Sequence, residues 1–550
     1  MNEVSVLIGG KAGDGINSAG SMVAQLLNHL GYRIYLYLDY PSLIRGGHNF
    51  AIIRGSEQDV CTCRNHIDFV LALNEETIER HKDKYTPNTV IISNLDLVKN
   101  SAYGIPVKAI LEEEKAPVIM GNSALIGGFA KAAGIEWKVV DAVFRRYIPK
   151  DIDLNLAVAK KAFDLFDPVH PIKKCENQPQ SLVSGNESIG LGLIRGGLNA
   201  YVSYPMTPSS GILHFLAEQK ERFGITVVHP ENEIAVILLA LGFAYAGKKS
   251  AIGTSGGGFC LMTEGLSLSG MAEIPVVIVV SQRTGPSTGL PTYTGQSDLQ
   301  FVLHAGQGEF PRMIVAPGDA QEAMCWSEIA MDIAWKCQCP AFILADKTLS
   351  EGTYSLDPAA VRNSSGADPL MWDGKTPYRR YEDTISGLSP MAFPGTKDAV
   401  VKVNSYMHNE AGITAEDADI SNRMTKKRLK KWETLIDVMQ GYPGVIQSGK
   451  PNASTALLCW GSVKGVCEEA AAELGLRVVR PVVLAPFPVD QIKKALLGVK
   501  RLIAIEENMT AQLAALAERH GIITQEKILR YDGRPFTVED LVSRIKEAGI

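Results

Sequence analysis

Short apolar runs alternate repeatedly with helical patterns along this chain, and this alternation limits the folds that are open to it. Near the N-terminus, the runs VSVLIG, RIYLYL and TVIISN are separated by longer stretches of helical periodicity such as NSAGSMVAQLLNHLG. The alternation returns after about residue 189 and again in the last hundred residues. Strands that alternate with helices are typical of α/β layers built on a largely parallel sheet. We therefore expect an α/β protein with three α/β domains.

Two stretches without periodicity separate these layers. One is the polar run KKCENQPQSLVSGNES, and the other is a long region rich in Pro, Gly, Ser and Asp. Such compositions predict linkers and irregular segments rather than packed strands. The expected order is an α/β domain (1–175), a linker (176–188), a second α/β domain (189–350), an irregular connector (351–450) and a third α/β domain (451–550).

Charge and hydropathy exclude several classes of protein. The net charge of −5 over 550 residues gives no reason to expect a nucleic-acid partner. No apolar run approaches the roughly 18 residues that a membrane helix needs. The N-terminal sequence MNEVSVLIGG lacks the basic start of a signal peptide. We therefore expect a cytoplasmic protein without a membrane partner.

The nine cysteines are scattered along the chain, and none forms a Cys-x-x-Cys pair. Such pairs usually hold iron–sulfur clusters or structural zinc. We expect reduced, mostly buried thiols and no metal site in this chain. If the protein carries out redox chemistry, the electrons leave through another subunit.

The glycine-rich stretch IGGKAGDG (8–15) follows the first predicted strand and allows three interpretations. It fits a dinucleotide loop, the metal–diphosphate motif of a thiamine enzyme, or a tight strand-to-helix turn. The thiamine motif requires an asparagine about 25 to 30 residues further on. Asn28 comes too early and Asn49 too late for that spacing. The metal–diphosphate interpretation therefore fails.

The dinucleotide interpretation is imperfect but stays open. Ser18 occupies the position of the third glycine, whereas Asp39 ends the second predicted strand, where an acid would bind a ribose. A glycine-rich turn at a helix N-terminus with Lys11 beside it also suits an anionic group. A turn that only packs the helix on the sheet is equally compatible.

The second domain carries polar loops directly after its predicted strands. YPMTPSS follows one strand, and its two prolines fix the loop at the edge where open α/β sheets bind ligands. Taken alone, it also fits an ordinary rigid turn. The residues that this loop offers to a ligand are Tyr204, Pro205, Thr207, Ser209 and Ser210.

Two glutamates stand at the start of HPENEIAVILLALGFAYAG, which is apolar nearly all round and therefore predicts a buried helix. Glu231 and Glu233 are two residues apart, so at most one of them faces the interior. A carboxylate in a dry site has a raised pKa and can share a proton with a nitrogen heterocycle. Alternatively, both glutamates only complement the helix dipole.

Two further loops complete the pattern. The glycines of GTSGGGF (253–259) allow a ligand to approach the backbone closely. Arg283 follows the apolar strand IPVVIVV and precedes a loop rich in Thr and Ser. A guanidinium in this setting is expected to bind a carboxylate, although a surface ion pair is the simpler alternative.

The order YPMTPSS, ENEIA, GTSGGG and RTGPSTGLPT resembles the pyrimidine-binding domain of the 2-oxoacid:ferredoxin oxidoreductases. These thiamine diphosphate enzymes make acyl-CoA. SLIRGGHNFAIIRGS (42–56) resembles the gamma domain of the family, and GLSPMAFPG (387–395) and KKRLKK (426–431) resemble its connector. LLCWGS, PFP and IEEN resemble its transketolase C-terminal-like domain. The resemblance covers essentially the whole chain and implies an alpha subunit with an N-terminally fused gamma domain.

The resemblance implies roles for individual residues. Glu233 would be the catalytic carboxylate that polarises the aminopyrimidine of the coenzyme. The implied substrate-binding residues are Thr207, Ser209 and Arg283, and the implied contacts to the cofactor are Glu233, Pro205, Gly256 and Gly257. In the gamma domain, the implied CoA-binding residues are Gly10, Lys11, Gly13, Gly15 and Arg45.

The resemblance also implies partners that this chain cannot replace. A beta subunit would supply Mg²⁺, the diphosphate site and a [4Fe-4S] cluster, and would form an (αβ)₂ heterotetramer that reduces ferredoxin. The overall resemblance favours 2-oxoglutarate as substrate, with succinyl-CoA as product and with reversal for CO₂ fixation also open. Pyruvate and branched-chain acids remain alternatives, as do a nucleotide-binding dehydrogenase and a non-catalytic assembly subunit.

Overall fold

The computed structural model describes residues 2–42, 47–99, 103–360 and 369–549. It is a mixed α/β structure with three sheets, and this confirms the fold class expected from the sequence. The chain divides into two compact units. The first consists of Met1–Val183, Glu351–Asp357 and Thr537–Ser543, and the second of Ser184–Ser350, Pro358–Phe536 and Arg544–Ile550. Among the described residues, no helix combines the length and the apolar character needed to cross a membrane.

The first unit is built on a sheet of eight strands in the order β6-β5-β4-β1-β3-β2-β14-β7. β1 pairs in parallel with β4 but antiparallel with β3, which in turn is antiparallel to β2. One apolar core joins the sheet to its helices. The strands are β1 (Glu3–Lys11), β2 (Arg33–Asp39), β3 (His48–Ser56), β4 (Ile67–Ala72), β5 (Tyr85–Asn94), β6 (Tyr103–Ile105), β7 (Ser181–Ser184) and β14 (Thr353–Leu356), and the helices include α1 (Ile16–His29), α2 (Glu75–His81), α3 (Val107–Glu113), α4 (Gly121–Ala132), α5 (Trp137–Tyr147) and α6 (Ile152–Phe163).

The segments expected to be irregular contain regular structure. The range 176–188 includes β7 and the first turn of α7 (Gly185–Arg195). β14, from the start of the expected connector, pairs antiparallel with β2. Short strands in polar sequence leave no hydropathy signal, so composition alone does not reveal β7 and β14. The domain boundaries drawn from composition remain a prediction.

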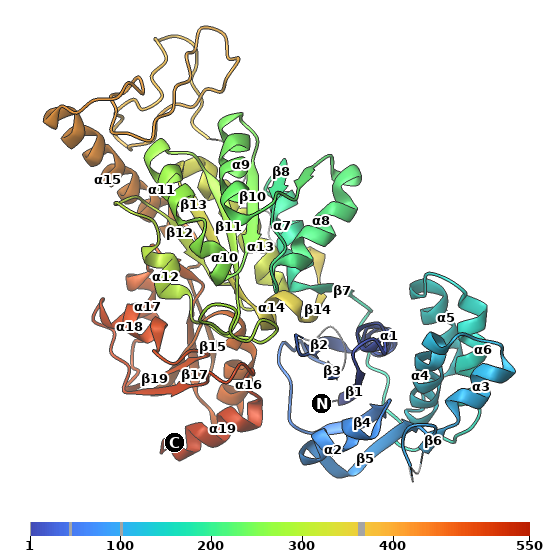
Figure 1. The fold of residues 1–550 in the computed structure, drawn as a ribbon. Coiled ribbons are helices and arrows are strands. Elements are labelled where there is room, and N and C mark those ends of the chain that lie inside the picture. The colour runs from blue at the N-terminus through green and yellow to red at the C-terminus, as the bar shows by residue number, and fades with distance from the viewer. Residues whose placement is uncertain (1, 43–46, 100–102, 361–368, 550) are drawn as a thin grey trace. The chain divides into compact units, whose positions relative to one another are not determined.

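The second unit contains a sheet of seven strands in the order β18-β12-β13-β11-β10-β8-β9 (Figure 1). All neighbours are parallel except β18, which runs antiparallel to β12 at one edge. The elements are α7, β8 (Ala200–Val202), α8 (Ser210–Phe223), β9 (Thr226–Val228), α9 (Glu233–Tyr245), β10 (Ser250–Thr254), α10 (Gly256–Cys260), α11 (Thr263–Ala272), β11 (Val276–Gln282), α12 (Leu299–His304), β12 (Met313–Val315), α13 (Ala320–Cys337), β13 (Pro340–Asp346), α14 (Lys347–Glu351) and β18 (Val483–Ala485).

The third sheet, also in the second unit, has five strands in the order β15-β17-β16-β19-β20. Its inner strands are parallel, and β15 is antiparallel to β17. The elements are β15 (Val445–Gly449), β16 (Thr455–Leu458), α16 (Lys464–Leu474), β17 (Arg477–Pro481), α17 (Val489–Ala495), β19 (Arg501–Glu506), α18 (Gln512–Glu518) and β20 (Glu526–Leu529). The last helix, α19 (Val538–Glu547), is divided, and its residues up to Ser543 belong to the first unit.

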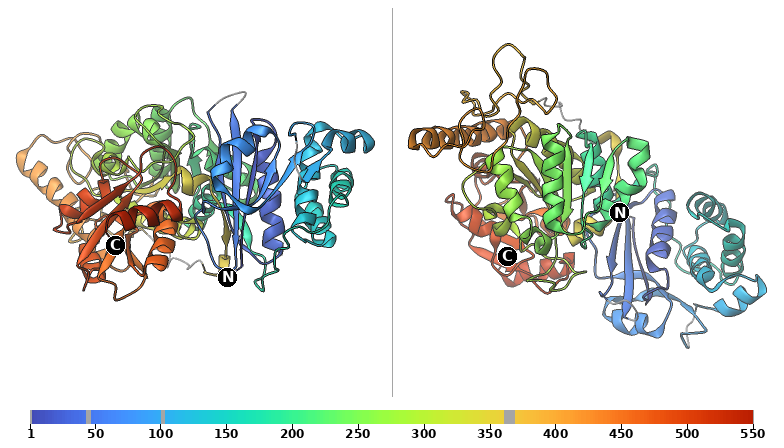
Figure 2. Two further views of the ribbon diagram at one scale, coloured as in Figure 1. Left: turned by 90° about the horizontal axis from the view of Figure 1, so that it is seen from below. Right: turned by 45° about the horizontal axis from the view of Figure 1, so that its top comes forward.

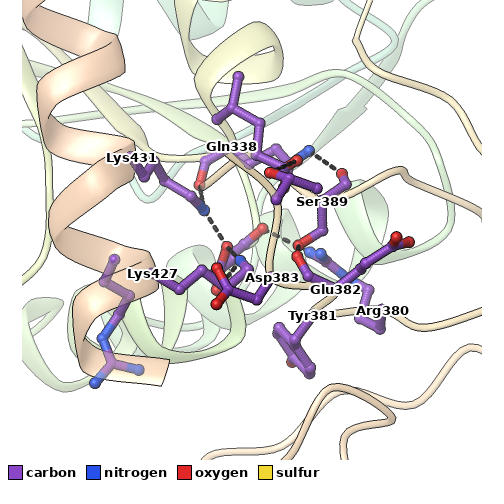
Figure 3. A network of polar contacts seen from close by, with 12 residues as sticks. Gln338, Arg380, Tyr381, Glu382, Asp383, Ser389, Lys427 and Lys431 are labelled. Atoms are coloured by element: carbon purple, nitrogen blue, oxygen red, sulfur yellow. Dashed lines mark hydrogen bonds and ion pairs between the residues drawn. The ribbon is translucent and has the colours of Figure 1, made fainter. Parts of the chain in front are cut away.

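The helix α15 (Ala418–Gln440) and the long loops before it belong to the second unit (Figure 1 and Figure 2). Lys427 and Lys431 extend from α15 toward the segment that carries Arg380 (Figure 3). Both lysines pair with the carboxylate of Glu273 at the end of α11, and all four side chains are buried. Burial raises the pKa of Glu273, but the three cations lower it well below its ordinary value. This buried ionic cluster holds α15 on the domain that contains the second sheet.

Replacing Glu273 with glutamine should destabilise the second unit strongly. Three buried cations would lose their carboxylate, and removing one partner of a buried ion pair costs about 3–5 kcal/mol. We expect a lower midpoint of thermal unfolding, measured by calorimetry. The control is Lys430→Met on the same helix, because Lys430 is half-exposed and pairs with Asp383. Equal midpoints for the two variants would contradict a stabilising role of the cluster.

Candidate active site

The loop after β8 places its polar groups at the carboxyl edge of the second sheet. Tyr204 and Pro205 are exposed, and Thr207 is half-buried. Ser209 is fully buried, and its hydroxyl donates to the carbonyl of Met206 at 2.8 Å. The hydroxyl of Ser209 therefore closes the turn.

Glu233 is the first residue of α9, and only 5% of it is exposed. The preceding residue Asn232 caps the helix, because its side-chain oxygen accepts from the amide of Ala235 at 2.9 Å. Glu231, outside the helix, is exposed. Of the two glutamates, only Glu233 thus turns into the domain.

The expectation that α9 is buried all round is wrong. The helix packs against β8 and β10 with one face. On the other face Ile234, Leu238 and Leu239 are 51%, 46% and 42% exposed. The sequence is apolar on both faces, but the residues that the structure describes cover only one of them fully. The exposed apolar face of α9, defined by these three residues, is therefore free to contact another chain.

The glycines that follow β10 and begin α10 bring two carboxylates close to the same stretch of backbone. A Cβ atom at Gly256 would collide with the carboxylate of Asp298, and one at Gly258 would lie 2.9 Å from Oε1 of Glu233 and collide with Thr254. Gly257 meets no atom closer than 3.8 Å. A side chain at 256 would thus displace Asp298, and one at 258 would displace Thr254 and press on Glu233.

Arg283 follows β11 and reaches across to the YPMTPSS loop. Its guanidinium donates to the carbonyl of Thr207 at 2.9 Å. Burial lowers the pKa of Arg283, and the nearby Asp298 opposes that shift. Two of the residues chosen from the sequence, Thr207 and Arg283, are therefore in contact.

Asp298 is a site residue that sequence reasoning missed. It directly precedes α12, where an acid usually caps a helix, but its side chain makes no capping hydrogen bond. Burial raises the pKa of Asp298 to about 6, against the lowering effect of Arg283. In the sequence, only the position of Asp298 before a helix stands out. That Asp298 lies close to Gly256 depends on the fold.

In the first unit, the glycine-rich loop connects β1 to α1. Gly13 and Gly15 have positive φ angles of 95° and 74°, which side chains other than glycine rarely adopt. The Asp14 carboxylate accepts from the amide of Lys11 at 2.7 Å, and Gly10 lies against that carboxylate. The Asp14 side chain thus stabilises the turn of its own loop. The Lys11 side chain is exposed.

A cavity of about 620 Å³ adjoins this loop. Gly13 and Asp14 form part of its wall, together with Asn122 and apolar residues of α3 and α4. Asn122 donates to the carbonyl of Asp14 at 2.7 Å. The loop therefore borders a space large enough for a small molecule. Arg45, the remaining residue predicted for this site, lies outside the described residues.

The strand order contradicts the dinucleotide-binding interpretation. In a dinucleotide fold, the first two strands are parallel neighbours. Here the antiparallel strand β3 lies between β1 and β2. Asp39 is buried and accepts a hydrogen bond from Tyr37 at 3.0 Å, so it does not stand open for a ribose.

Comparison with known proteins agrees with this geometry. A family model described as "Pyruvate flavodoxin/ferredoxin oxidoreductase, thiamine diP-bdg" matches residues 191–427, and one described as "Pyruvate ferredoxin/flavodoxin oxidoreductase" matches residues 5–165. The 2-oxoacid:ferredoxin oxidoreductase subunit alpha of Sulfolobus sp is 30% identical over 98% of this chain and 96% of its own length. The 2-oxoglutarate oxidoreductase subunit KorA of Mycobacterium tuberculosis is 25% identical over 100% of this chain and 92% of its own.

A solved structure is similar over the whole chain. It is the 2-oxoglutarate:ferredoxin oxidoreductase from Magnetococcus marinus with 2-oxoglutarate, coenzyme A and succinyl-CoA bound. The TM-score is 0.91 at 29% identity, with 100% of this chain and 99% of that chain covered. Fold and site thus define the class, a subunit of a thiamine-dependent oxidoreductase. The chain belongs to the 2-oxoacid:ferredoxin oxidoreductase family and is one of its alpha subunits. This confirms the resemblance drawn from the motifs.

The residues around Glu233 fit thiamine diphosphate. Glu233 is buried, and its carboxylate forms no hydrogen bond with the residues that the structure describes. Within the same described part of the chain, the buried hydroxyl of Ser255 also lacks a partner. A buried carboxyl group can share a proton with a ring nitrogen of an aminopyrimidine, and the glycines let such a ring approach the backbone closely. For magnesium the described residues offer no comparable group of ligands.

Proposed function

We propose that the chain is the catalytic alpha subunit of an enzyme that converts 2-oxoglutarate and CoA to succinyl-CoA and CO₂ and passes the electrons to ferredoxin. The convergence of Glu233, Arg283 and Thr207 at one sheet edge carries this proposal. The full-length similarity to the Magnetococcus marinus enzyme supports the choice of 2-oxoglutarate, and pyruvate or a branched-chain acid is the alternative substrate. The same convergence argues against a non-catalytic assembly subunit.

Glu233 would hold the coenzyme's aminopyrimidine. When bound, thiamine diphosphate supplies the carbon nucleophile that attacks the keto carbon of the substrate. Glu233 would share a proton with the ring nitrogen, which it can do because water is largely excluded around it. Gly256, Gly257 and Pro205 would form the wall that allows the ring to lie close to the backbone.

Arg283 would bind the carboxylate next to the keto group, since its guanidinium offers a fork of donors. Its hydrogen bond to the Thr207 carbonyl fixes one nitrogen and leaves other donors for the substrate. Asp298 would be ionised in the free site near neutral pH, because burial raises its pKa only to about 6. Binding of a substrate carboxylate beside it would favour the protonated form.

The test of this proposal is co-expression with the partner subunit, followed by assay of a panel of 2-oxoacids. We expect CoA- and thiamine-dependent reduction of a one-electron dye, with the highest kcat/KM for 2-oxoglutarate. A higher value for pyruvate or a branched-chain acid would change the substrate. No activity with any acid in a cluster-loaded complex would overturn the enzymatic function.

We further propose that a beta subunit supplies the diphosphate site, Mg²⁺ and the [4Fe-4S] cluster in an (αβ)₂ complex that reduces ferredoxin. The exposed apolar face of α9 supports this arrangement. The helix begins at Glu233, so a partner that completes the coenzyme site must approach its N-terminal end. Burying the three exposed side chains would also provide apolar contact area for association.

Leu238→Glu should therefore weaken association of the two subunits. A charge in the centre of an apolar contact costs several kcal/mol when it is desolvated without a partner. We expect less partner in affinity co-purification and a shift from complex to free subunits in size-exclusion chromatography. Leu429→Glu on α15, where the leucine is also exposed, is the matched control. Intact complex in the Leu238 variant would exclude this face as the interface.

For CoA, we propose the loop with Gly10, Lys11, Gly13 and Gly15, together with Arg45. The adjacent cavity and the exposed position of Lys11 support binding of a phosphate-bearing molecule. A turn that only packs α1 on the sheet is the alternative.

Lys11→Ala should raise the KM for CoA about fivefold, because a charge-assisted hydrogen bond at an exposed site contributes about 1 kcal/mol. The KM for the 2-oxoacid should stay the same. Lys138→Ala, which removes an exposed lysine of α5, is the control. If both Lys11→Ala and Arg45→Ala leave the KM for CoA unchanged, the loop has only a packing role.

A further inference from the structure

The segment 284–297 joins Arg283 to Asp298, and hydrogen bonds to the C-terminal part of the second unit hold its last four residues, 294–297. The amide of Thr294 donates to the carbonyl of Gly533 at 3.1 Å. The side chain of Gln512 donates to the carbonyl of Ser297 at 2.7 Å. Both ends of the segment carry residues of the candidate active site, so these contacts bear directly on its geometry.

Gln296 and Glu507 form the centre of this attachment. The amide of Gln296 donates to the carbonyl of Glu507 at 2.8 Å, and the amide of Glu507 donates to Oε1 of Gln296 at 3.1 Å. The Gln296 side chain also donates to the carbonyl of Trp460 at 3.0 Å. Glu507 directly follows β19, so the third sheet positions it rigidly.

The side chain of Glu507 extends the attachment toward Arg283. Its Oε1 accepts from the amide of Phe536 at 3.2 Å, and its Oε2 lies 3.4 Å from Oγ1 of Thr294. The hydroxyl of Thr284, the residue after Arg283, donates to the carbonyl of Thr294 at 2.6 Å. A continuous chain of contacts therefore runs from Glu507 through Thr294 to the residue next to Arg283.

The surroundings of Glu507 favour its neutral form. Burial and the facing carboxylate of Asp346 raise the pKa of Glu507 to about 8, although Arg530 and the two hydrogen bonds oppose the shift. Asp346 is buried and accepts from Ser462 and from the amide of Leu349. Burial raises the pKa of Asp346 as well, but these donors oppose the shift and so favour its charged form.

Other titratable groups near Glu507 have little effect on whether its carboxyl group is neutral or charged. Arg530 pairs with Asp532 on the exposed side. The adjacent carboxylate of Glu506 is buried and is held by Trp460, Asn508 and two backbone amides of α18. The buried thiol of Cys467 has a pKa raised by burial and so carries no charge near neutral pH.

We propose that Glu507 is a positioning residue for the 2-oxoacid site, and that its neutral carboxyl group fixes segment 284–297 and, through it, Arg283 and Asp298. The proposal rests on the proposed role of Arg283. When Glu507 ionises, a second charge appears in a buried site opposite Asp346, and this desolvation and repulsion outweigh the hydrogen bonds that Thr294 and Phe536 donate. The segment then loosens, and the KM for the 2-oxoacid rises.

The first test measures the kinetics of the αβ complex as a function of pH. Wild-type enzyme should show a rise in the KM for the 2-oxoacid as the pH passes about 8, the pKa of Glu507. Glu507→Gln keeps a neutral group of the same shape and should remove this rise while leaving the KM at pH 7 near wild type. Glu507→Ala should raise the KM about fivefold at pH 7, the effect of one lost hydrogen bond, with the KM for CoA unchanged. Glu518→Gln on α18, where the side chain is half-exposed, is the control.

A second test does not depend on turnover. Hydrogen–deuterium exchange of segment 284–297 is compared between wild type and Glu507→Gln at the same pH, so that the intrinsic pH dependence of exchange cancels. We expect equal exchange at pH 7 and several-fold faster exchange in wild type at pH 9. A wild-type-to-variant ratio that is the same at both pH values would overturn the proposal, as would a KM profile that Glu507→Gln does not alter. An inactive wild-type complex would overturn the proposed function instead, and the exchange comparison would still decide the role of Glu507.

Discussion

Glu233→Gln should lower kcat by about 10²–10⁴-fold, the range usually contributed by a positioned acid–base group. The amide of glutamine cannot share a proton with the ring nitrogen of the coenzyme. The fold should remain intact, because none of the described residues forms a hydrogen bond that depends on this carboxylate and the side-chain volume is unchanged. Steady-state kinetics of the co-expressed complex, together with the amount of bound thiamine diphosphate, measure this effect.

The control for this variant lies two residues away. Glu231→Gln removes a carboxylate of the same kind from an exposed position and should leave kcat near wild type. Gly258→Ala should also lower kcat, since a Cβ atom there would collide with the Thr254 hydroxyl and press on Oε1 of Glu233. If Glu233→Gln kept near-normal turnover, another group would have to activate the coenzyme.

Arg283→Ala should raise the KM for the 2-oxoacid by about 10–100-fold. A hydrogen bond to a charged group contributes about 1.5–3 kcal/mol, and the substrate carboxylate would lose its principal cation. The variant also leaves Asp298 without the guanidinium that lowers its pKa. Asp298 would then stay protonated to higher pH, and the acid limb of the KM profile should move upward.

Arg283→Lys separates charge from geometry. Lysine keeps the positive charge but lacks the planar fork, so we expect an intermediate KM. The KM for CoA should be unaffected in both variants. An unchanged KM for the 2-oxoacid in Arg283→Ala would exclude the carboxylate-binding role.

Sequence patterns predict much of this fold because each pattern is local. Strand-end loops such as YPMTPSS and GTSGGGF are recognisable from adjacent residues, and parallel strands bring such loops to one edge of a sheet. The proximity of Thr207 to Arg283 can therefore be predicted from the order of the motifs alone. Local geometry indicates only that at most one of Glu231 and Glu233 faces the interior; the choice of Glu233 comes from the resemblance to the family.

The remaining features depend on contacts between distant residues. Asp298 resembles an ordinary helix cap until the fold brings it against Gly256. Glu507 belongs to a hydrophobic strand end whose neighbour Asp346 is far away in sequence. The open face of α9 leaves no separate hydropathy signal, because a face that contacts another subunit is as apolar as one that is buried in its own domain.

The strand β18 limits where the chain can be divided, both in the laboratory and in evolution. It is contributed by the C-terminal part of the chain but completes the edge of the seven-stranded sheet next to β12. A fragment that ends before β15 would leave one edge of β12 unpaired, and unpaired edges promote aggregation. The seven-stranded sheet thus depends on a strand that lies beyond the start of the third sheet in sequence, and we expect gene fusions and splits in such proteins to fall outside the second unit.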